Sequence, residues 1–319
     1  MFSGQAVISH LAEEAIKEDV AASSHWQKFH SEFKFNGQEF AGLQGFGGRS
    51  ELQKGPRLWL SRILQRRLRR FGQPYPGFSA IDALAHEVTF RQQRAYDLDV
   101  LRQAITIAFL QASAPEKFNK NATGCVIGDG FASMSTLLLA SGSAGRIVLV
   151  NLTKTLLVDL WYLKLWMGDS AFASSVDLVV DEAGLVRALA KPRFIATGAP
   201  HIIAVQASDH QLLGKCPLDF VINIVSMQEM NPPVVAAYFE DMRAIARERE
   251  LLFYCCNREE KDLPDGTVTR FTDYPWLADD KILVDGLCPW NQYYYSTRPP
   301  FYRPYDGPVR HRLVTLSSH

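Results

Sequence analysis

The sequence lacks an excess of either charge and lacks a long apolar run. Lys plus Arg and Asp plus Glu each number 34 among 319 residues, so the formal net charge is zero. Proteins that bind nucleic acid without sequence preference usually carry a basic excess, so we expect no nucleic-acid partner. No apolar run reaches the roughly 20 residues that a transmembrane helix needs. Residues 1–20 carry acidic side chains and no basic leader, so we expect no secretory signal and a cytoplasmic location.

Cysteines are few and odd in number, and metal-binding motifs are missing from the sequence. Without an H-E-x-x-H, a paired C-x-x-C or an EF-hand loop, we predict no metal requirement. A metal site assembled from residues distant in sequence, such as Asp209, His210 and Glu229, stays open. An odd number of cysteines in mostly apolar surroundings indicates buried thiols in a reducing compartment. The five are Cys125, Cys216, Cys255, Cys256 and Cys288.

The first part of the chain has the composition of a helical region. Good helix formers fill 8–33, 56–72 and 79–112, while six glycines mark 37–55 as a loop. Residues 113–124 form a polar linker, at which we place a domain boundary. We therefore predict a helical N-terminal domain over 1–120, acting as a lid or an oligomer contact, and a second domain over 121–319.

From Gly124 onward, short apolar strands alternate with helical segments. Because the strands hardly alternate apolar with polar residues, they suit a parallel sheet that is covered on both faces. The alternation predicts a doubly wound, mostly parallel α/β domain. Two more alternating segments, 291–296 and 311–318, predict an antiparallel edge pair. The strands are expected at 125–128, 146–151, 201–206, 219–225 and 251–256, and the helices at 133–141, 153–168 and 231–250.

A turn of small residues follows the first of these strands. Gly128, Gly130 and Ala132 would let a ligand approach the backbone closely, although a plain tight turn is the simpler interpretation. The spacing is not G-x-G-x-x-G, which disfavours a nicotinamide dehydrogenase. Asn151 ends the next strand at the distance where dinucleotide folds place a ribose-binding acid. Its amide can bind ribose hydroxyls, or it can serve only as a helix cap.

Five segments together resemble the sugar O-methyltransferase family. They are "VIGDGFASMS" at 126–135, "VLVNLTKTLLVDLWYL" at 148–163, "DFVINIVSMQEMNPPVVAAYF" at 219–239, "LLFYCCNRE" at 251–259 and "FTDYPW" at 271–276. The resemblance covers roughly 124–276. It implies a Rossmann-like class I methyltransferase fold, S-adenosylmethionine as cofactor, and a sugar or glycan hydroxyl of polysaccharide biosynthesis as methyl acceptor.

The resemblance also implies which residues hold the cofactor. The chain departs from the general class I pattern because Val126 and Asn151 stand where acids are common, and Asp129 can compensate for the first. Asp209 can accept from the adenine amino group. The expected cofactor-binding residues are Gly128, Asp129, Gly130, Ala132, Asn151, Leu152, Ser208, Asp209 and Ser226.

Methyl transfer to a sugar hydroxyl needs a base, because such a hydroxyl does not ionise at neutral pH. Glu229, which follows the fourth strand, is our first candidate, and His210 is the second. Their simpler interpretations are a solvated loop carboxylate and a surface histidine. The residues expected to bind the substrate are Asn257, Arg258, Asp273 and Tyr274, for which a loop salt bridge or loop packing is the alternative.

A basic amphipathic segment and two competing functions complete the predictions. The segment 57–70 holds six arginines and no acid, so it suits an anionic membrane surface or a plain surface helix. A homodimer is a further expectation. The competing functions are a methyltransferase for a small natural-product acceptor and a non-catalytic cofactor-binding scaffold, which the replaced acids at Val126 and Asn151 keep open.

Overall fold

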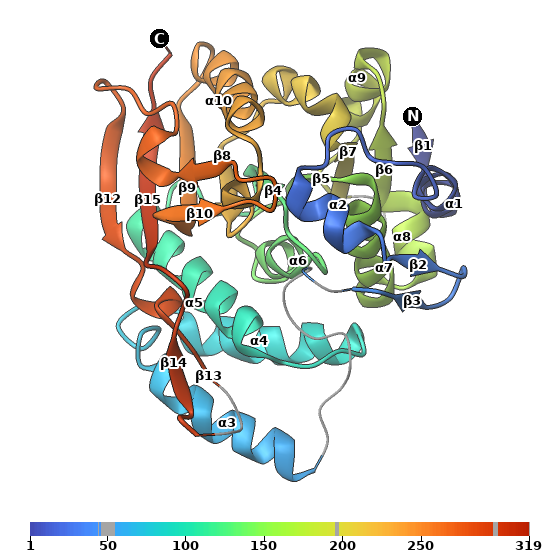
Figure 1. Cartoon of the computed structure of the whole chain (residues 1–319). Coiled ribbons are helices and arrows are strands. Elements are labelled where there is room, and N and C mark those ends of the chain that lie inside the picture. The colour runs from blue at the N-terminus through green and yellow to red at the C-terminus, as the bar shows by residue number, and fades with distance from the viewer. Residues whose placement is uncertain (44, 46–54, 195–197, 296–298, 319) are drawn as a thin grey trace.

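The computed structural model describes residues 1–43, 45, 55–194, 198–295 and 299–318 (Figure 1). Most of the expected glycine-rich loop, at 44 and 46–54, lies outside the described residues. The helices are α1 (Gln5–Glu14), α2 (Ser24–His30), α3 (Pro56–Arg69), α4 (Phe78–Arg91), α5 (Leu98–Ser113), α6 (Ser133–Ala140), α7 (Thr153–Met167), α8 (Asp169–Ser175), α9 (Glu182–Ala190) and α10 (Pro232–Ala246), with short 3-10 helices η1 (Ala207–Lys215), η2 (Met227–Glu229), η3 (Phe271–Asp273) and η4 (Pro289–Asn291).

A nine-stranded sheet forms the centre of the molecule, in the order β1-β6-β7-β5-β4-β8-β9-β15-β12. The six strands from β6 to β9 are parallel, and β1 and β15 pair with their neighbours in the antiparallel direction. The expected mostly parallel α/β sheet is thereby confirmed. The strands are β1 (Phe2–Ser3), β4 (Thr123–Ile127), β5 (Arg146–Asn151), β6 (Val176–Val179), β7 (His201–Gln206), β8 (Phe220–Ile224), β9 (Leu251–Arg258), β12 (Lys281–Leu287) and β15 (Val309–Leu316).

Successive residues of the parallel strands enter two different cores, because side chains alternate between the faces of a sheet. Val126 and Ile147 belong to the core with α5, α6 and α7, whereas Cys125 and Val148 belong to the core with α9 and α10. From β4 the chain runs to β5 and β7 on one side, then crosses to β8 and β9 on the other. The order therefore reverses beside β4, and ligands of such sheets bind at the carboxyl ends of strands at this point.

The front part of the chain packs directly on the sheet. Buried residues of α1, α4 and α5 share one core with β4, β5 and β7, and β1 extends the sheet. In Figure 1, α4 and α5 lie below the sheet, and α3 lies below them at the end of the molecule that is far from the sheet. The division at about residue 120 stays a prediction, since one core joins the two parts.

Six short strands form three hairpin pairs, and one of these pairs corrects a sequence prediction. The expected pairing of 291–296 with 311–318 is wrong, because β13 (Tyr293–Tyr295) pairs with β14 (Tyr302–Pro304). β15 instead lies between β9 and β12, which take up the backbone hydrogen-bonding groups of both its edges and leave none for residues 291–296. The remaining pairs are β2 (Lys34–Phe35) with β3 (Phe40–Ala41), and β10 (Glu260–Asp262) with β11 (Val268–Arg270).

Helix α3 presents an exposed basic face. Arg62, Arg66 and Arg70 are exposed, as is Trp59, while Arg69 turns inward to Asp82 with Nε 2.9 Å from Oδ2. Membrane contact through 57–70 and a homodimer stay predictions. Within the described ranges, none of the helices is both long and apolar enough to cross a bilayer.

Candidate active site

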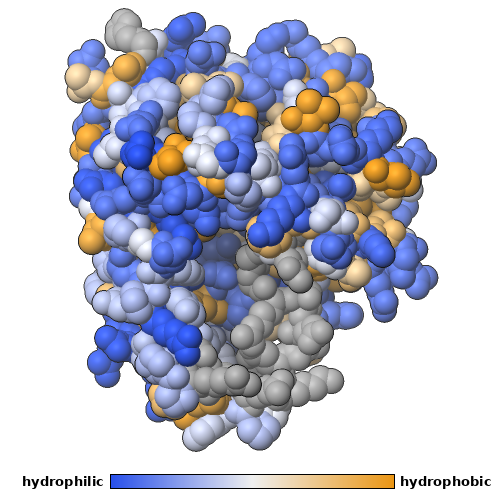
Figure 2. Space-filling view, viewed as in Figure 1, coloured by the Kyte–Doolittle hydropathy of each residue, from blue (hydrophilic) through white to orange (hydrophobic). Residues whose placement is uncertain are grey.

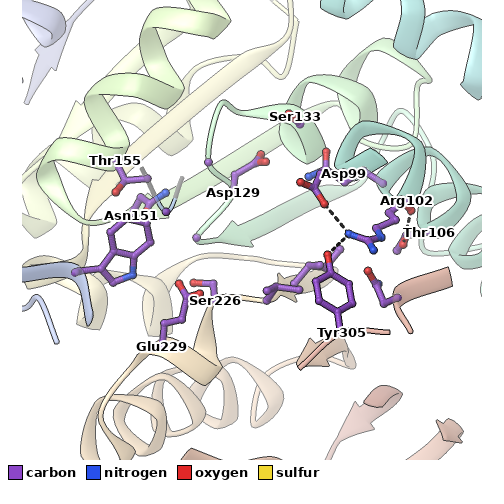
Figure 3. A pocket seen from close by; sticks show the side chains of 18 of the residues that line it. Asp99, Arg102, Thr106, Asp129, Ser133, Asn151, Thr155, Ser226, Glu229 and Tyr305 are labelled. Carbon is purple, nitrogen blue, oxygen red and sulfur yellow. Dashed lines mark hydrogen bonds and ion pairs between the residues drawn. The ribbon is translucent and has the colours of Figure 1, made fainter. Parts of the chain in front are cut away.

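Two adjoining cavities open at the carboxyl ends of β4, β5, β7 and β8. The first has a volume of about 450 Å³ and the second about 330 Å³. Figure 2 shows the surface hollowed between the sheet-bearing upper part and the helices below it. Both cavities are lined by Trp26, Gly128, Asn151, Ser226 and Glu229 (Figure 3). The two cavities therefore share one wall, which consists of the glycine turn and the loops after β5 and β8.

The turn after β4 admits no side chain at its first glycine. Gly128 has φ 72°, and a Cβ built on it would lie 1.9 Å from Ser226 Oγ. Its N–H donates to the carbonyl of Val150 at 2.9 Å, which ties the turn to β5. Gly130 has φ 67°, so the left-handed conformation recurs two residues later. The close approach of backbone and Ser226 explains why this position requires glycine.

Backbone strain is concentrated around the first cavity. Among the described residues, the non-glycine positions with positive φ are Gln93, Phe131, Ala132 and Val225. Val225, which lines the first cavity, has φ 54° although it is β-branched. Such a conformation costs about 1–3 kcal/mol and persists mainly where a functional geometry requires it. The strain at Val225 therefore favours this edge of the sheet as the candidate functional site.

The buried carboxylate of Asp159 connects the glycine turn to Asn151 at the end of β5. Its Oδ1 accepts the N–H of Ala132 at 2.8 Å, and its Oδ2 accepts Nδ2 of Asn151 at 2.8 Å. Burial, followed by the charge of Asp129, raises the pKa of Asp159 well above its usual value. Sequence reasoning missed this residue. The available signal was one acid in the otherwise apolar run 155–163.

Asp129 lies in the turn and caps the helix that follows. Its two carboxylate oxygens accept the N–H groups of Met134 at 2.9 Å and Ser135 at 2.7 Å. Burial raises the pKa of Asp129, while these N–H groups and the Arg94 guanidinium oppose the rise. Arg94 is buried in the wall of the first cavity, where its Nη2 donates to Ser133 Oγ.

Glu229 stands at the junction of the cavities. Its side chain is 13% exposed, and Oε1 lies 3.5 Å from Nε2 of His25. Burial raises the pKa of Glu229 to about 8, against the opposing charges of Lys261 and Arg258. Burial also lowers the pKa of His25 to about 4, so this imidazole is neutral at pH 7. With a pKa of about 8 this carboxyl is mostly protonated at pH 7, and its ionised form, which grows as the pH rises toward 8, is a stronger base than an ordinary carboxylate.

A buried amide network holds the loop that carries Glu229. Asn223 Oδ1 accepts the N–H of Met227 at 3.0 Å and Nδ2 of Asn257 at 2.9 Å. Asn257 Oδ1 in turn accepts the N–H of Gln228 at 3.2 Å. Asn257 is fully buried, so the structure assigns it to positioning η2 and not to the cavity lining.

The second cavity collects several predicted residues on an apolar wall. Leu152, Ser208 and His210 line it, and Asp209 does not. His210 Nδ1 lies 2.6 Å from Oδ2 of Asp241, whose hydrogen bond raises the pKa of His210. The structure thus brings Glu229 to both cavities and His210 only to the second.

The other three predicted substrate residues, like Asn257, lie outside both cavities. Arg258 Nη1 is 3.5 Å from Asp306 Oδ2, and its guanidinium lies 5.9 Å from the ring of Tyr305, which lines the first cavity. Tyr274 is buried among the aromatic rings packed on α10, and the Asp273 carboxylate is exposed next to it.

Helix α5 provides a wall of the first cavity that sequence reasoning missed. Asp99, Arg102, Gln103 and Thr106 line the cavity from this helix, whose other central residues are buried and apolar. Their spacing places them on one helical face. A polar stripe at i, i+3, i+4 and i+7 in an apolar helix is a signal that the sequence contains. Across the described part of the chain, no cluster of three His, Cys, Asp or Glu side chains could hold a metal ion.

Comparison with known proteins gives only distant likenesses. No protein-family model matches the sequence, and no curated protein does. A candidate sarcosine dimethylglycine methyltransferase from Galdieria sulphuraria is 12% identical, with 68% of this chain and 88% of that chain covered and a TM-score of 0.41. Magnesium protoporphyrin IX methyltransferase from Synechocystis PCC 6803, with bound SAH, is 15% identical over 69% and 84%, with a TM-score of 0.38. A mutant of MtNAS is 10% identical over 98% and 96%, with a TM-score of 0.37.

Proposed function

We propose that the protein is an S-adenosylmethionine-dependent O-methyltransferase whose acceptor is a sugar or glycan hydroxyl. The observation that carries the proposal is the glycine turn at the switch point, which separates an apolar cavity from a polar one beside Glu229. The choice of a sugar acceptor is supported by the five resembling segments and by the Trp26 and Tyr305 rings that line the polar cavity. Aromatic rings of this kind pack well against the apolar faces of sugar rings.

The residues present fit the cofactor. The second cavity offers Val150, Leu152 and Tyr238 around a flat base. One N–H of the Asn151 amide donates to Asp159, and one lone pair of its oxygen accepts the N–H of Leu152. The second N–H and the second lone pair stay available for ribose hydroxyls. Gly128 lines both cavities and presents only its backbone to them. The buried Arg94 guanidinium in the first cavity is suited to the amino-acid carboxylate.

Glu229 is the proposed base. When bound, the cofactor supplies a methyl group already activated on a sulfonium sulfur. The Glu229 carboxylate takes the proton of the acceptor hydroxyl, whose oxygen then carries the electron pair for attack. A neutral His25 and the Asn223–Asn257 network hold this carboxyl at the junction of the cavities.

Two measurements test the proposal. Calorimetry with S-adenosylhomocysteine and, in parallel, with NAD distinguishes the cofactor class. Transfer of a labelled methyl group to a panel of free and nucleotide-linked sugars distinguishes an enzyme from a scaffold, and a parallel panel of natural-product phenols tests the competing acceptor class. Binding of NAD without S-adenosylhomocysteine, or cofactor binding without transfer to any hydroxyl, would contradict the proposal.

A further inference from the structure

The wall of the first cavity formed by α5 and η4 directs its hydrogen-bond donors into the protein. Arg102 Nη1 donates to Asp99 Oδ1 at 2.8 Å and to the Tyr305 hydroxyl, and Nη2 and Nε donate to the carbonyls of Tyr293 at 2.6 Å and Trp290 at 3.1 Å. Asp99 therefore balances the positive charge of this guanidinium, and neighbouring oxygens accept its hydrogen bonds.

Two further donors on this wall are used in the same way. The hydroxyl of Thr106 donates to the carbonyl of Arg102 at 2.8 Å and accepts Nε1 of Trp290 at 3.0 Å. Asn291 Nδ2 donates to Sγ of Cys256 at 3.3 Å and Sγ of Cys288 at 3.4 Å. Neither side chain presents this donor to an incoming anion.

Gln103 lines this wall, and its buried Oε1 has no hydrogen-bond partner among the described residues. An unpaired buried carbonyl oxygen costs about 1–3 kcal/mol, so a rotation of the amide that turns this oxygen toward a ligand O–H or N–H relieves the cost. Asp99, one turn earlier on the same face, adds a carboxylate to the acceptor character of the wall.

We infer that the α5 stripe is the acceptor subsite and that it recognises a neutral hydroxyl or an amino group, and not a phosphate or carboxylate. This inference rests on the proposed function, because it places the methyl acceptor in the first cavity opposite Glu229. With its amide turned toward the cavity, Gln103 accepts a hydrogen bond through Oε1 from a substrate hydroxyl next to the one that is methylated. The proposed acceptor is thus a sugar whose ring in the cavity is uncharged or cationic, and a phosphate group of the substrate lies outside it.

Three versions of one sugar test the charge preference. Methyl β-D-glucoside, glucosamine and glucose 6-phosphate are titrated, with S-adenosylhomocysteine bound, and followed by ligand-observed NMR. We expect the neutral and cationic sugars to bind and the phosphate to bind at least about 10-fold more weakly. Tighter binding of the phosphate, or binding of none of the three to the protein loaded with S-adenosylhomocysteine, overturns the subsite. Failure of S-adenosylhomocysteine itself to bind overturns the proposed function instead.

Substitutions at Gln103 locate the interaction. Gln103→Leu removes the acceptor oxygen, and one net hydrogen bond of about 0.5–1.5 kcal/mol predicts a loss of about 2- to 10-fold in affinity for methyl β-D-glucoside. Gln103→Glu keeps an acceptor oxygen, so we expect it to bind methyl β-D-glucoside as before and to bind the cationic glucosamine more tightly. Unchanged S-adenosylhomocysteine affinity and melting temperature show that both variants are folded. Equal binding of methyl β-D-glucoside by Gln103→Leu and the parent protein contradicts the assignment.

Discussion

The two cavities share a wall but differ in the chemistry of the rest of their lining. The second is lined mainly by apolar residues, among them Val20, Ile127, Val150 and Leu152. The first contains the charged side chains of Arg94, Asp99, Arg102 and Asp129. The apolar cavity suits a flat nucleobase, which gains by leaving water, whereas the polar cavity suits groups that need directed hydrogen bonds. Under the proposed function, the nucleoside of the cofactor lies in the second cavity, while its amino-acid end and the acceptor lie in the first.

The largest expected effect is the loss of turnover on removing the base. Glu229→Gln should lower kcat by about 10²- to 10⁴-fold, which is the usual contribution of a general base, while S-adenosylhomocysteine affinity changes little. Steady-state rates with a labelled methyl donor and parallel calorimetry measure the two effects. Glu248→Gln, an exposed glutamate just after the end of α10, is the matched control. Full turnover in Glu229→Gln would remove the base assignment and with it the functional division of the cavities.

The next largest effect is expected from the shared wall itself. Gly128→Ala places a Cβ 1.9 Å from Ser226 Oγ at a φ of 72°, so the turn must move. We expect S-adenosylhomocysteine affinity to fall by about 100-fold, or about 2.8 kcal/mol. Gly266→Ala is the control, because Gly266 has φ 86° but a Cβ added there would meet nothing within 4 Å. It has a similar backbone strain without the clash, so equal losses in both variants would show that strain alone explains the effect.

A smaller effect is expected at the carboxylate beneath the wall. Asp159→Ala leaves the Ala132 N–H and Asn151 Nδ2 without their acceptor, which costs about 1–3 kcal/mol of stability. Because Asn151 then loses its orientation, we expect S-adenosylhomocysteine to bind about 10-fold more weakly. Thermal unfolding and calorimetry measure both, with the exposed Asp279→Ala as control. A loss of stability without a loss of affinity would separate Asp159 from the cofactor site.

The smallest expected effect is a dependence of stability on pH at Glu229. Its pKa in the folded protein, about 8, lies above the ordinary value of 4.5, so the folded state holds the proton more tightly. Stability from this group is complete below about pH 4.5 and is lost as pH rises toward 8. Glu229→Gln should therefore melt a few degrees higher than the parent protein at pH 9, and at nearly the same temperature at pH 5. If the difference in melting temperature between Glu229→Gln and the parent protein is the same at pH 5 and pH 9, the raised pKa of a buried Glu229 is contradicted.

The sequence was sufficient to predict the regular parts of the sheet and several residues of the wall that the two cavities share. β5 and β7 were predicted at their observed bounds, because an apolar strand flanked by helices needs no distant partner to be recognised. β6 was missed, because its short run includes Asp177, whose buried carboxylate is paired with Lys191 Nζ at 2.7 Å, His201 Nε2 at 2.9 Å and Ser3 Oγ at 2.5 Å. That compensation comes from elsewhere in the chain.

Residues whose position depends on tertiary packing were the ones that the sequence did not resolve. Asn151 ends a strand, and Gly128, Ser226 and Glu229 follow strands, so topology alone places them at one edge of the sheet. Asp159 and the α5 stripe lie within helices, and only packing decides that Asp159 meets the glycine turn and that the stripe meets the first cavity. Tyr274 illustrates the reverse case, because its ring packs against Phe271 at 5.4 Å in the aromatic cluster beside α10.

The most direct test of the two-cavity account is a crystal structure of the protein with S-adenosylhomocysteine. The account predicts the adenine in the apolar cavity beside Leu152 and Tyr238, the ribose at Asn151, and the amino-acid carboxylate near Arg94. It also predicts that the sulfur faces Glu229 across the glycine turn. A nucleoside bound in the polar cavity against the α5 stripe, or bound away from Gly128, would contradict it.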